Sequence, residues 1–203
     1  ADTRQITELD GSKAAQNNGY EKAIFCEARN GIYFLKTVGE VYSNQQSYEL
    51  IFYDIAAKTY QTVYSYDRAE TAYSSAEAVY FLESSSKSEE NGQTSYDIVI
   101  TRYDLNSGAV SEIKPESLYS SLNWAGFIDA IGVDQKGRIY LTTQDKEIYL
   151  FSADGTLLDQ KSLGESISQF YGFDPVNGNF YYCGTYNWRY WGFDHSMASL
   201  MAG

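Results

Sequence analysis

Hydrophobic and polar positions alternate over short distances along this chain. Apolar and aromatic runs of four or five residues, such as 31–35 and 78–82, are separated by turns rich in Gly, Asn, Asp and Ser. Runs of this length between turn residues are typical of β-strands. The pattern therefore predicts an all-β fold, with almost no α-helix between residues 20 and 195.

Four segments of the chain repeat two aromatic landmarks in the same order. The first landmark is a tyrosine within an apolar strand, and the second is an aromatic residue where a later strand runs into a turn. The tyrosines are Tyr33, Tyr80, Tyr140 and Tyr181, and the strand-end aromatics are Tyr53, Tyr103, Phe151 and Phe193. More polar outer strands are expected at residues 60–66, 109–114 and 156–163. Length variation is confined to the loops, which indicates a repeat of one antiparallel unit.

Turn residues at fixed places support the repeat. Gly and Asn tolerate the positive φ angles that tight hairpins require. Turns between first and second strands are expected at 30–31, 136–137 and 177–178, and turns between third and fourth strands at 106–108 and 154–155. The second copy departs from the pattern, because Ser75, Ala76 and Glu77 occupy its first turn. A Ser-rich stretch without apolar side chains, residues 83–95, is predicted to be a mobile, exposed loop.

Four antiparallel strands in a unit of about 40 to 50 residues are typical of a propeller blade. Residues 131–141 and 148–155 resemble a blade of the NHL or quinoprotein-like β-propeller families. The resemblance implies a propeller fold and no particular activity. The predicted blades span approximately residues 20–68, 69–118, 119–164 and 165–203 of a single domain, 1–203. A β-sandwich is the alternative, since it also has many short strands.

Closure of the predicted propeller has two possible forms. Residues 3–9 resemble an outer strand and could complete the last blade of a closed four-bladed ring, or the chain could be part of a larger ring. Cys26 and Cys183 fall in the first and last units. Hemopexin-like propellers close with a disulfide between first and last blades, and this arrangement resembles them in that respect only. Both cysteines lie in apolar strands, so we expect reduced, buried thiols.

The charge of the chain limits its partners. Twenty-seven acidic against 15 basic residues give a net charge of −12, which disfavours nucleic acid and anionic membrane surfaces. No apolar run approaches the roughly 20 residues of a spanning helix, so no membrane insertion is expected. The sequence begins without a signal peptide, so an intracellular protein and a mature or trimmed secreted one are the two alternatives. The abundance of Ser, Tyr, Asn, Gly and Thr favours the second, a secreted or cell-surface protein.

Catalytic and metal-binding patterns are sparse. The one histidine, His195, is expected in a terminal turn as a solvated side chain. Asp129, Asp134 and Asp174 are the candidate carboxylates, but Asp134 and Asp174 lie in or beside hairpin turns, where Asp stabilises the bend. Calcium, phosphate and dinucleotide motifs are absent from the sequence. We therefore expect no cofactor and no metal, and the chain is not expected to be an enzyme.

Aromatic residues beside polar ones are the best candidates for binding. Residues 186–193 hold five aromatics around one arginine, and Trp188, Arg189, Tyr190 and Trp191 are predicted ligand-binding residues. Asn123 and Trp124, in a loop entering the third unit, are further candidates. Packing between blades is the alternative role of these aromatics.

These observations together favour a non-catalytic extracellular binding or interaction module of bacterial type. It would recognise a glycan or a protein through an aromatic rim. A propeller-type enzyme, either a lyase or a glycoside-active protein, and a structural spacer domain are the alternatives.

Overall fold

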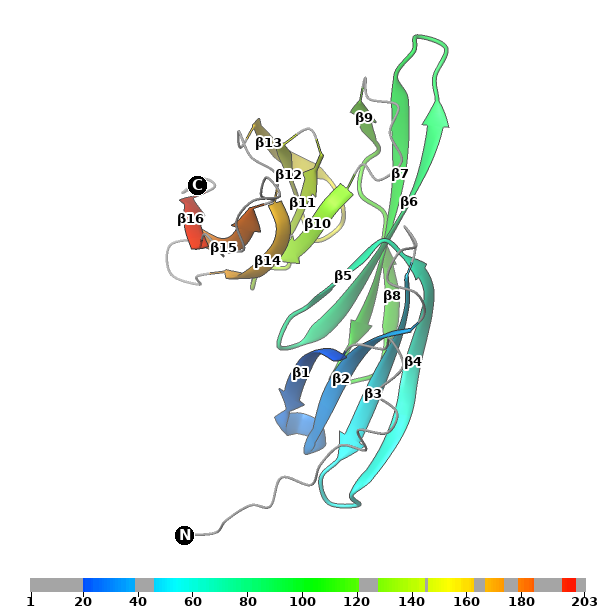
Figure 1. Cartoon of the computed structure of the whole chain (residues 1–203), viewed down its shortest axis with the longest axis vertical. Helices are drawn as coiled ribbons and strands as arrows, with labels where there is room; N and C mark the ends of the chain where they lie inside the picture. Colours follow the sequence, from blue (N-terminus) through cyan, green and yellow to red (C-terminus); the bar gives the residue numbers. More distant parts are fainter. Residues whose placement is uncertain are drawn as a thin grey trace, which may run out of the picture. The chain divides into compact units, whose positions relative to one another are not determined.

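The computed structural model describes residues 20–38, 46–120, 128–144, 146–162, 167–173, 179–184 and 195–199, with side chains for residues 23–38, 47–119, 128–144 and 146–162. These ranges contain sixteen strands, one short 3-10 turn and no α-helix, so the all-β prediction is confirmed (Figure 1). The strands form four antiparallel sheets. The chain divides into two compact units, Ala1–Arg68 and Ala69–Gly203, and the expected single domain stays a prediction.

The first unit contains one four-stranded sheet in chain order. Its strands are β1 (Tyr20–Cys26), β2 (Gly31–Val38), β3 (Gln46–Asp54) and β4 (Thr59–Ala69), and the 3-10 turn η1 (Glu27–Arg29) follows β1. Burial along β2 alternates strictly from one residue to the next, as expected for a strand with one buried face. Tyr33 and Leu35 of β2 pair with Phe52 and Leu50 of β3 on that buried face.

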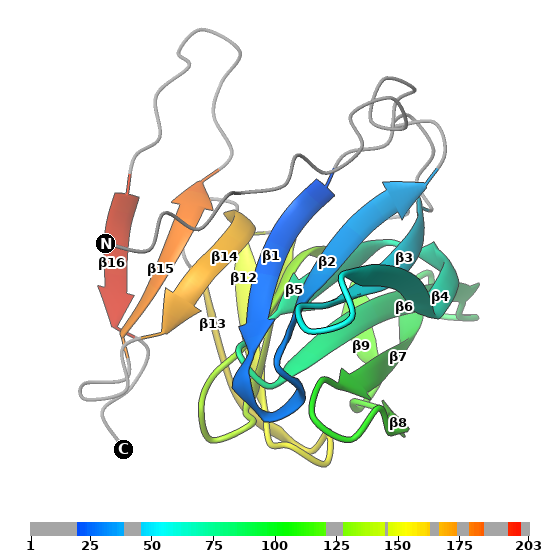
Figure 2. The same cartoon turned by 90° about the horizontal axis from the view of Figure 1, so that it is seen from below.

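The second unit contains the other three sheets, and their described strands also follow chain order. The second sheet comprises β5 (Thr71–Ser74), β6 (Ala78–Ser88), β7 (Thr94–Asp104) and β8 (Val110–Ile113), with β9 (Leu118–Ser120) added beside β7. The third comprises β10 (Ile128–Val133), β11 (Ile139–Thr143), β12 (Glu147–Phe151) and β13 (Leu157–Ser162). The fourth comprises β14 (Ile167–Phe173), β15 (Asn179–Gly184) and β16 (His195–Ser199) (Figure 2).

Sequential hairpins of this kind differ from the Greek-key order of a β-sandwich. We predicted three or four strands in each sheet. The second sheet has five, because β9 pairs with the first residues of β7, from Thr94 to Tyr96. The last sheet also differs from expectation. Its third strand was predicted to end near His195, and β16 instead begins there, with His195 opposite Cys183. Pairing with β15 outweighs the weak β-propensity of the Met, Ala and Ser residues in this segment.

The predicted hairpin turns are confirmed wherever the structure describes them. Asn30, Gly108, Gly137 and Gly155 all have positive φ, at 47°, 73°, 75° and 94°. The second sheet achieves its first turn without glycine. There the Ser75 hydroxyl accepts the backbone N–H groups of Glu77 (3.2 Å) and Ala78 (3.0 Å). These hydrogen bonds stabilise the turn in place of the positive-φ residue that the other turns contain. The expected turn at 177–178 lies outside the described residues.

The stretch predicted as a loop, residues 83–95, is a β-hairpin that is mostly exposed as expected, but strands replace most of the loop. Strands β6 and β7 continue through it in unbroken register as far as the pair Ser88 and Thr94. Gly92, with φ of 81°, closes the turn, and Glu89 donates its backbone N–H to Gln93. Thr94 and Ser95 are buried, whereas the β6 side of this extension is largely exposed. Cross-strand pairing with β7 and β9 stabilises a segment that has few apolar side chains of its own.

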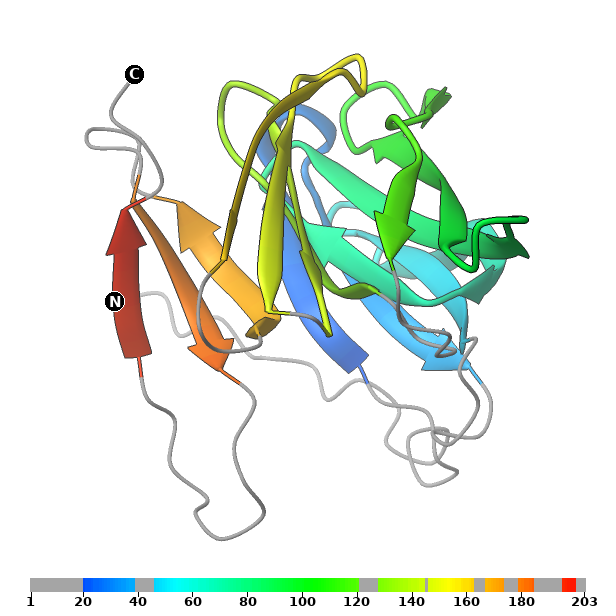
Figure 3. The ribbon, with the colours of Figure 1, turned by 90° about the horizontal axis from the view of Figure 1, so that it is seen from above.

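The second and third sheets share one hydrophobic core. It includes Leu82 and Ile100 of the second sheet and Ile131, Leu141 and Phe151 of the third. Strand β10, the first of its sheet, contacts β5 and β14, the first strands of the neighbouring sheets (Figure 3). Within the described ranges, no helix is long and apolar enough to cross a membrane.

Candidate functional site

One face of the first sheet is buried, and the opposite face carries aromatic side chains that reach the solvent. On this second face, Ile32 lies opposite Phe25 on one side and Tyr53 on the other. Phe34 and Ile51 form the next cross-strand pair. Because side chains alternate along a strand, the whole row of even positions in β2 belongs to this face. Between Phe25 and Phe34 the face is therefore apolar and only partly covered.

The aromatic residues concentrate at the end of the sheet where two turns meet. Phe25 is 60% exposed, Tyr60 48% and Ile55 38%. The rings of Tyr53 and Tyr60 lie 4.5 Å apart between centroids, with planes inclined by 32°. We name Phe25, Tyr53, Ile55 and Tyr60 the aromatic rim. It offers a ring pair, with apolar neighbours, that a ligand can approach from solvent.

Local hydrogen bonds hold the two turns of the rim together. Asp54 Oδ1 accepts the backbone N–H of Ala57 at 2.8 Å, which shapes the β3–β4 turn. Lys58 completes this turn with a φ of 56°. The backbone N–H of Ile55 donates to the carbonyl of Asn30 at 3.3 Å, so the β3–β4 turn is tied to the β1–β2 turn. The backbone therefore fixes the spacing between Phe25 and the tyrosine pair.

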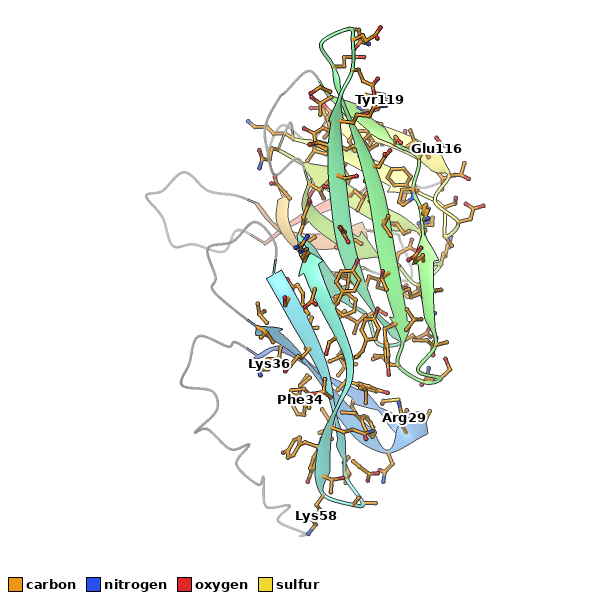
Figure 4. All side chains as sticks on the ribbon, turned by 90° about the vertical axis from the view of Figure 1, so that its right-hand side faces the viewer. Arg29, Phe34, Lys36, Lys58, Glu116 and Tyr119 are labelled. Atoms are coloured by element: carbon orange, nitrogen blue, oxygen red, sulfur yellow. The ribbon has the colours of Figure 1, made fainter. Side chains whose placement is uncertain are left out.

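Cationic side chains flank the aromatic face. Figure 4 shows Arg29 and Lys58 at the turn end of the sheet, with Phe34 and Lys36 further along it. Lys36 Nζ lies 3.2 Å from Glu49 Oε2, and this pair interrupts the apolar row. The Arg29 guanidinium hydrogen-bonds the Tyr33 hydroxyl and stacks over Phe52 at 4.6 Å from the ring centroid. Arg29 is thus engaged with the buried face, and Lys58 is an exposed cation beside the rim.

The repeated tyrosine proves to be a buried structural residue in three sheets. Tyr33, Tyr80 and Tyr140 are each at most 7% exposed. Tyr80 hydrogen-bonds Arg102, and the Tyr140 hydroxyl lies 3.3 Å from Asp134 Oδ2, which also binds Arg138. Burial raises the pKa of Tyr140 to about 12, and that of Tyr73 to the same value. The phenols of Tyr73 and Tyr140 therefore stay protonated at neutral pH, and Tyr80 and Tyr140 serve as buried hydrogen-bonding groups.

Two carboxyl groups have a raised pKa because they are partly buried. Burial raises the pKa of Asp129, on β10, to about 6. Glu70 also has a raised pKa, again because of burial, although Ser84 donates its hydroxyl to Glu70 Oε1 at 2.6 Å and thereby opposes the effect. Among the described residues, no group of three or more His, Cys, Asp or Glu side chains is placed to hold a metal ion.

Asp129 makes stability depend on pH in a testable way. Its pKa of about 6 in the folded chain exceeds the ordinary value of 3.8, so folding favours the protonated carboxyl. Stability from this group is present below about pH 4 and is lost as the pH rises toward 6. We expect Asp129→Asn to raise the melting temperature at pH 7.5 and to leave it nearly unchanged at pH 4. Equal shifts at both pH values would contradict this.

The predicted site residues fall partly outside the described structure. Asn123, Trp124, Trp188, Arg189, Tyr190, Trp191 and Asp174 all lie outside the described residues. Asp134 has the predicted turn-stabilising role, since its Oδ1 accepts the N–H groups of Lys136 and Arg138, both at 2.9 Å. Cys26 is buried, as predicted, and the side chain of Cys183 is not described.

The aromatic rim was not predicted from the sequence. Its residues come from three strands and a turn, and only the register brings them together. The sequence pattern predicts Tyr53 as a strand-end aromatic and Tyr60 as the start of an outer strand. The one available signal was the abundance of tyrosine on both sides of the turn at residues 54–59.

Comparisons with known proteins give weak similarities. BamB from Moraxella catarrhalis is 11% identical with a TM-score of 0.42, over 80% of this chain and 40% of that chain. A Bacteroides caccae protein of unknown function is 14% identical with a TM-score of 0.35, over 72% of this chain and 64% of that chain. The chain thus spans less than two thirds of either protein. No family model and no curated protein matches the sequence.

Proposed function

We propose that this chain is a non-catalytic binding module that recognises a neutral glycan through its aromatic rim. The observation that supports the proposal is the pair formed by Tyr53 and Tyr60, whose rings are 4.5 Å apart and only 32° from parallel. Tyr60 is half exposed, and Phe25, at 60% exposed, extends the apolar area across the sheet. Rings presented in this way match the apolar face of a pyranose.

Tyrosine combines the two properties that sugar recognition needs. Its ring supplies apolar contact area at a small cost in side-chain entropy, and its hydroxyl can exchange hydrogen bonds with sugar hydroxyls. Asp54 shapes the turn between the two tyrosines by accepting the backbone N–H of Ala57, and the exposed Lys58 adds a polar group to that turn. The net charge of −12 disfavours anionic glycans, so an uncharged ligand fits the chain best.

The proposal includes an extracellular location and a propeller architecture. In the second unit, the first strands of three successive sheets are neighbours, with β10 in contact with β5 and β14, as expected for blades around a common axis. We propose that the four sheets are blades of one domain, 1–203, similar to NHL or quinoprotein-like blades. Either a closed four-bladed ring or a segment of a larger ring is compatible with this arrangement.

Binding experiments on single variants test the proposed function. The labelled chain is applied to an array of neutral glycans, and the affinity for each glycan that binds is then measured by titration calorimetry. We expect Tyr60→Ala and Phe25→Ala each to weaken binding about tenfold, which corresponds to about 1.4 kcal/mol and lies within the range for stacking contacts of an aromatic side chain. Their melting temperatures should change little because both side chains are exposed. Leu158→Ala is the matched control, at 53% exposed on the third sheet.

The same array distinguishes the two aromatic groups. Asn123, Trp124, Trp188, Arg189, Tyr190 and Trp191 remain a proposed second part of the binding rim. If Trp124→Ala or Trp188→Ala abolishes binding while Tyr60→Ala does not, the ligand binds there and the rim of the first sheet is not the site. Absence of glycan binding, with capture of a peptide from a peptide array, would replace the glycan with a protein ligand.

A further inference from the structure

The aromatic rim is part of a row of apolar side chains that runs across all four strands of the first sheet. Phe25 of β1 pairs with Ile32 of β2, and Ile32 pairs with Tyr53 of β3. The ring of Tyr53 lies 4.5 Å from the ring of Tyr60 on β4. Each strand therefore contributes one side chain to the row. Because neighbouring strands are about 4.8 Å apart, the row extends over about 14 Å from β1 to β4.

The apolar surface is shorter in the direction of the strands. After Ile32, the next side chain of β2 on this face is Phe34, and the one after it is Lys36, which is ion-paired with Glu49 (Figure 4). In the opposite direction β2 begins at Gly31, one residue before Ile32. Two apolar positions of β2, about 7 Å apart, thus lie between the turn and the ion pair. The long axis of the apolar surface therefore runs across the strands.

Exposed aromatic area is greatest at the two ends of the row. Phe25 is 60% exposed and Tyr60 is 48% exposed, whereas Ile32 and Tyr53 between them are half-buried. A ligand of one sugar unit would cover one end and leave the aromatic ring at the other end in water. A ligand that removes both rings from water has to be extended and at least as long as the row. Such a ligand buries the most apolar area on this face.

We propose that the rim binds an unbranched, extended glycan that lies across the strands and contacts the sheet through about three sugar units. This inference rests on the proposed function and specifies its ligand class. One pyranose ring is similar in width to one strand spacing, so one unit fits each interval between β1 and β4. The pair of Tyr53 and Tyr60 binds the unit at one end, and Phe25 binds the unit at the other. A chain that curls after the first unit would leave the sheet before it reached Phe25.

Oligosaccharides of different length test the proposal on the native chain. The probes are β-1,4-linked glucose, mannose and xylose, which form extended neutral chains, and α-1,4-linked glucose, whose chain curls, each titrated from one unit to five. In at least one β-linked series, affinity should rise about tenfold or more from one unit to three and then level off, whereas the α-linked series should gain little. Affinity that does not depend on length, or an array that selects other glycans while every β-linked series fails to bind, overturns this inference and leaves the proposed function intact. Absence of binding to any glycan overturns both.

Two matched variants test the direction in which the glycan lies. Phe25→Leu and Phe34→Leu each remove one ring of the same face and keep apolar bulk, so the sheet should remain folded, which the melting temperature checks. Phe25 lies along the proposed ligand axis, and Phe34 lies along the strand direction. Phe25→Leu should weaken binding of the three-unit ligand about fivefold and reduce the gain in affinity from one unit to three. Phe34→Leu should retain that gain. Loss of the gain in Phe34→Leu, with its retention in Phe25→Leu, would place the glycan along the strands and overturn the inference.

Discussion

Replacing Leu141 with alanine is expected to lower the free energy of unfolding by about 3 to 4 kcal/mol, because it removes three buried carbon atoms and leaves a cavity. Leu141 is on β11, the second strand of the third sheet, and is 0% exposed. It belongs to the core that the second and third sheets share. Both neighbouring β11 residues, Tyr140 and Thr142, are also buried, so the strand has little freedom to close the cavity. Urea unfolding followed by tryptophan fluorescence and circular dichroism measures the change.

Leu158 provides a control of the same residue type. It lies on β13 of the same sheet and is 53% exposed. Leu158→Ala should change the free energy of unfolding by less than about 1 kcal/mol, since little apolar area returns to water. Similar losses for the two variants would show that the third sheet is not buried as the structure has it. A change in the slope with urea concentration would indicate that the two units unfold separately.

The repeat could be predicted because its signals are local. Turn residues with positive φ, such as Asn30 and Gly137, mark hairpins directly in the sequence. Residues 83–95 show the limit of local signals. Their composition resembles a disordered loop, yet Ser86 pairs with Tyr96, a residue ten positions away that is 3% exposed. A polar strand beside a well-anchored one takes its structure from the partner, which composition does not reveal.

The candidate site was harder to predict than the fold. Phe25, Tyr53 and Tyr60 belong to three strands, and their proximity depends on the register of each pair. A shift of one residue would move every side chain to the other face. The exposure of these side chains could not be predicted from residue type either. Tyr33 is 0% exposed, whereas Tyr60 is 48% exposed. The sequence predicted an aromatic binding surface, but it pointed to Trp124 and to residues 188–191 and not to Phe25, Tyr53 and Tyr60.

Asp134 combines several roles that the repeat alone does not explain. Its side chain is 7% exposed, and its Oδ1 holds two backbone N–H groups of the turn. Its Oδ2 lies 2.7 Å from Arg138 Nε and 3.3 Å from the Tyr140 hydroxyl. One carboxylate therefore connects the β10–β11 turn to the repeated tyrosine. Its negative charge also contributes to the raised pKa of Tyr73, on the second sheet.

Asp134→Ala is accordingly expected to lower the free energy of unfolding by about 3 kcal/mol, because it removes a hydrogen-bond acceptor of the partly buried Arg138 and the buried Tyr140. Asp134→Asn should cost less, about 1 to 2 kcal/mol, since its amide oxygen can still accept the turn N–H groups while the charge is lost. Urea unfolding of Asp134→Ala, Arg138→Ala and the double variant isolates the coupling between the two side chains. The double variant should be less destabilised than the sum of the single variants. Additive losses would show that Asp134 acts on the turn only and that the ion pair with Arg138 contributes nothing measurable.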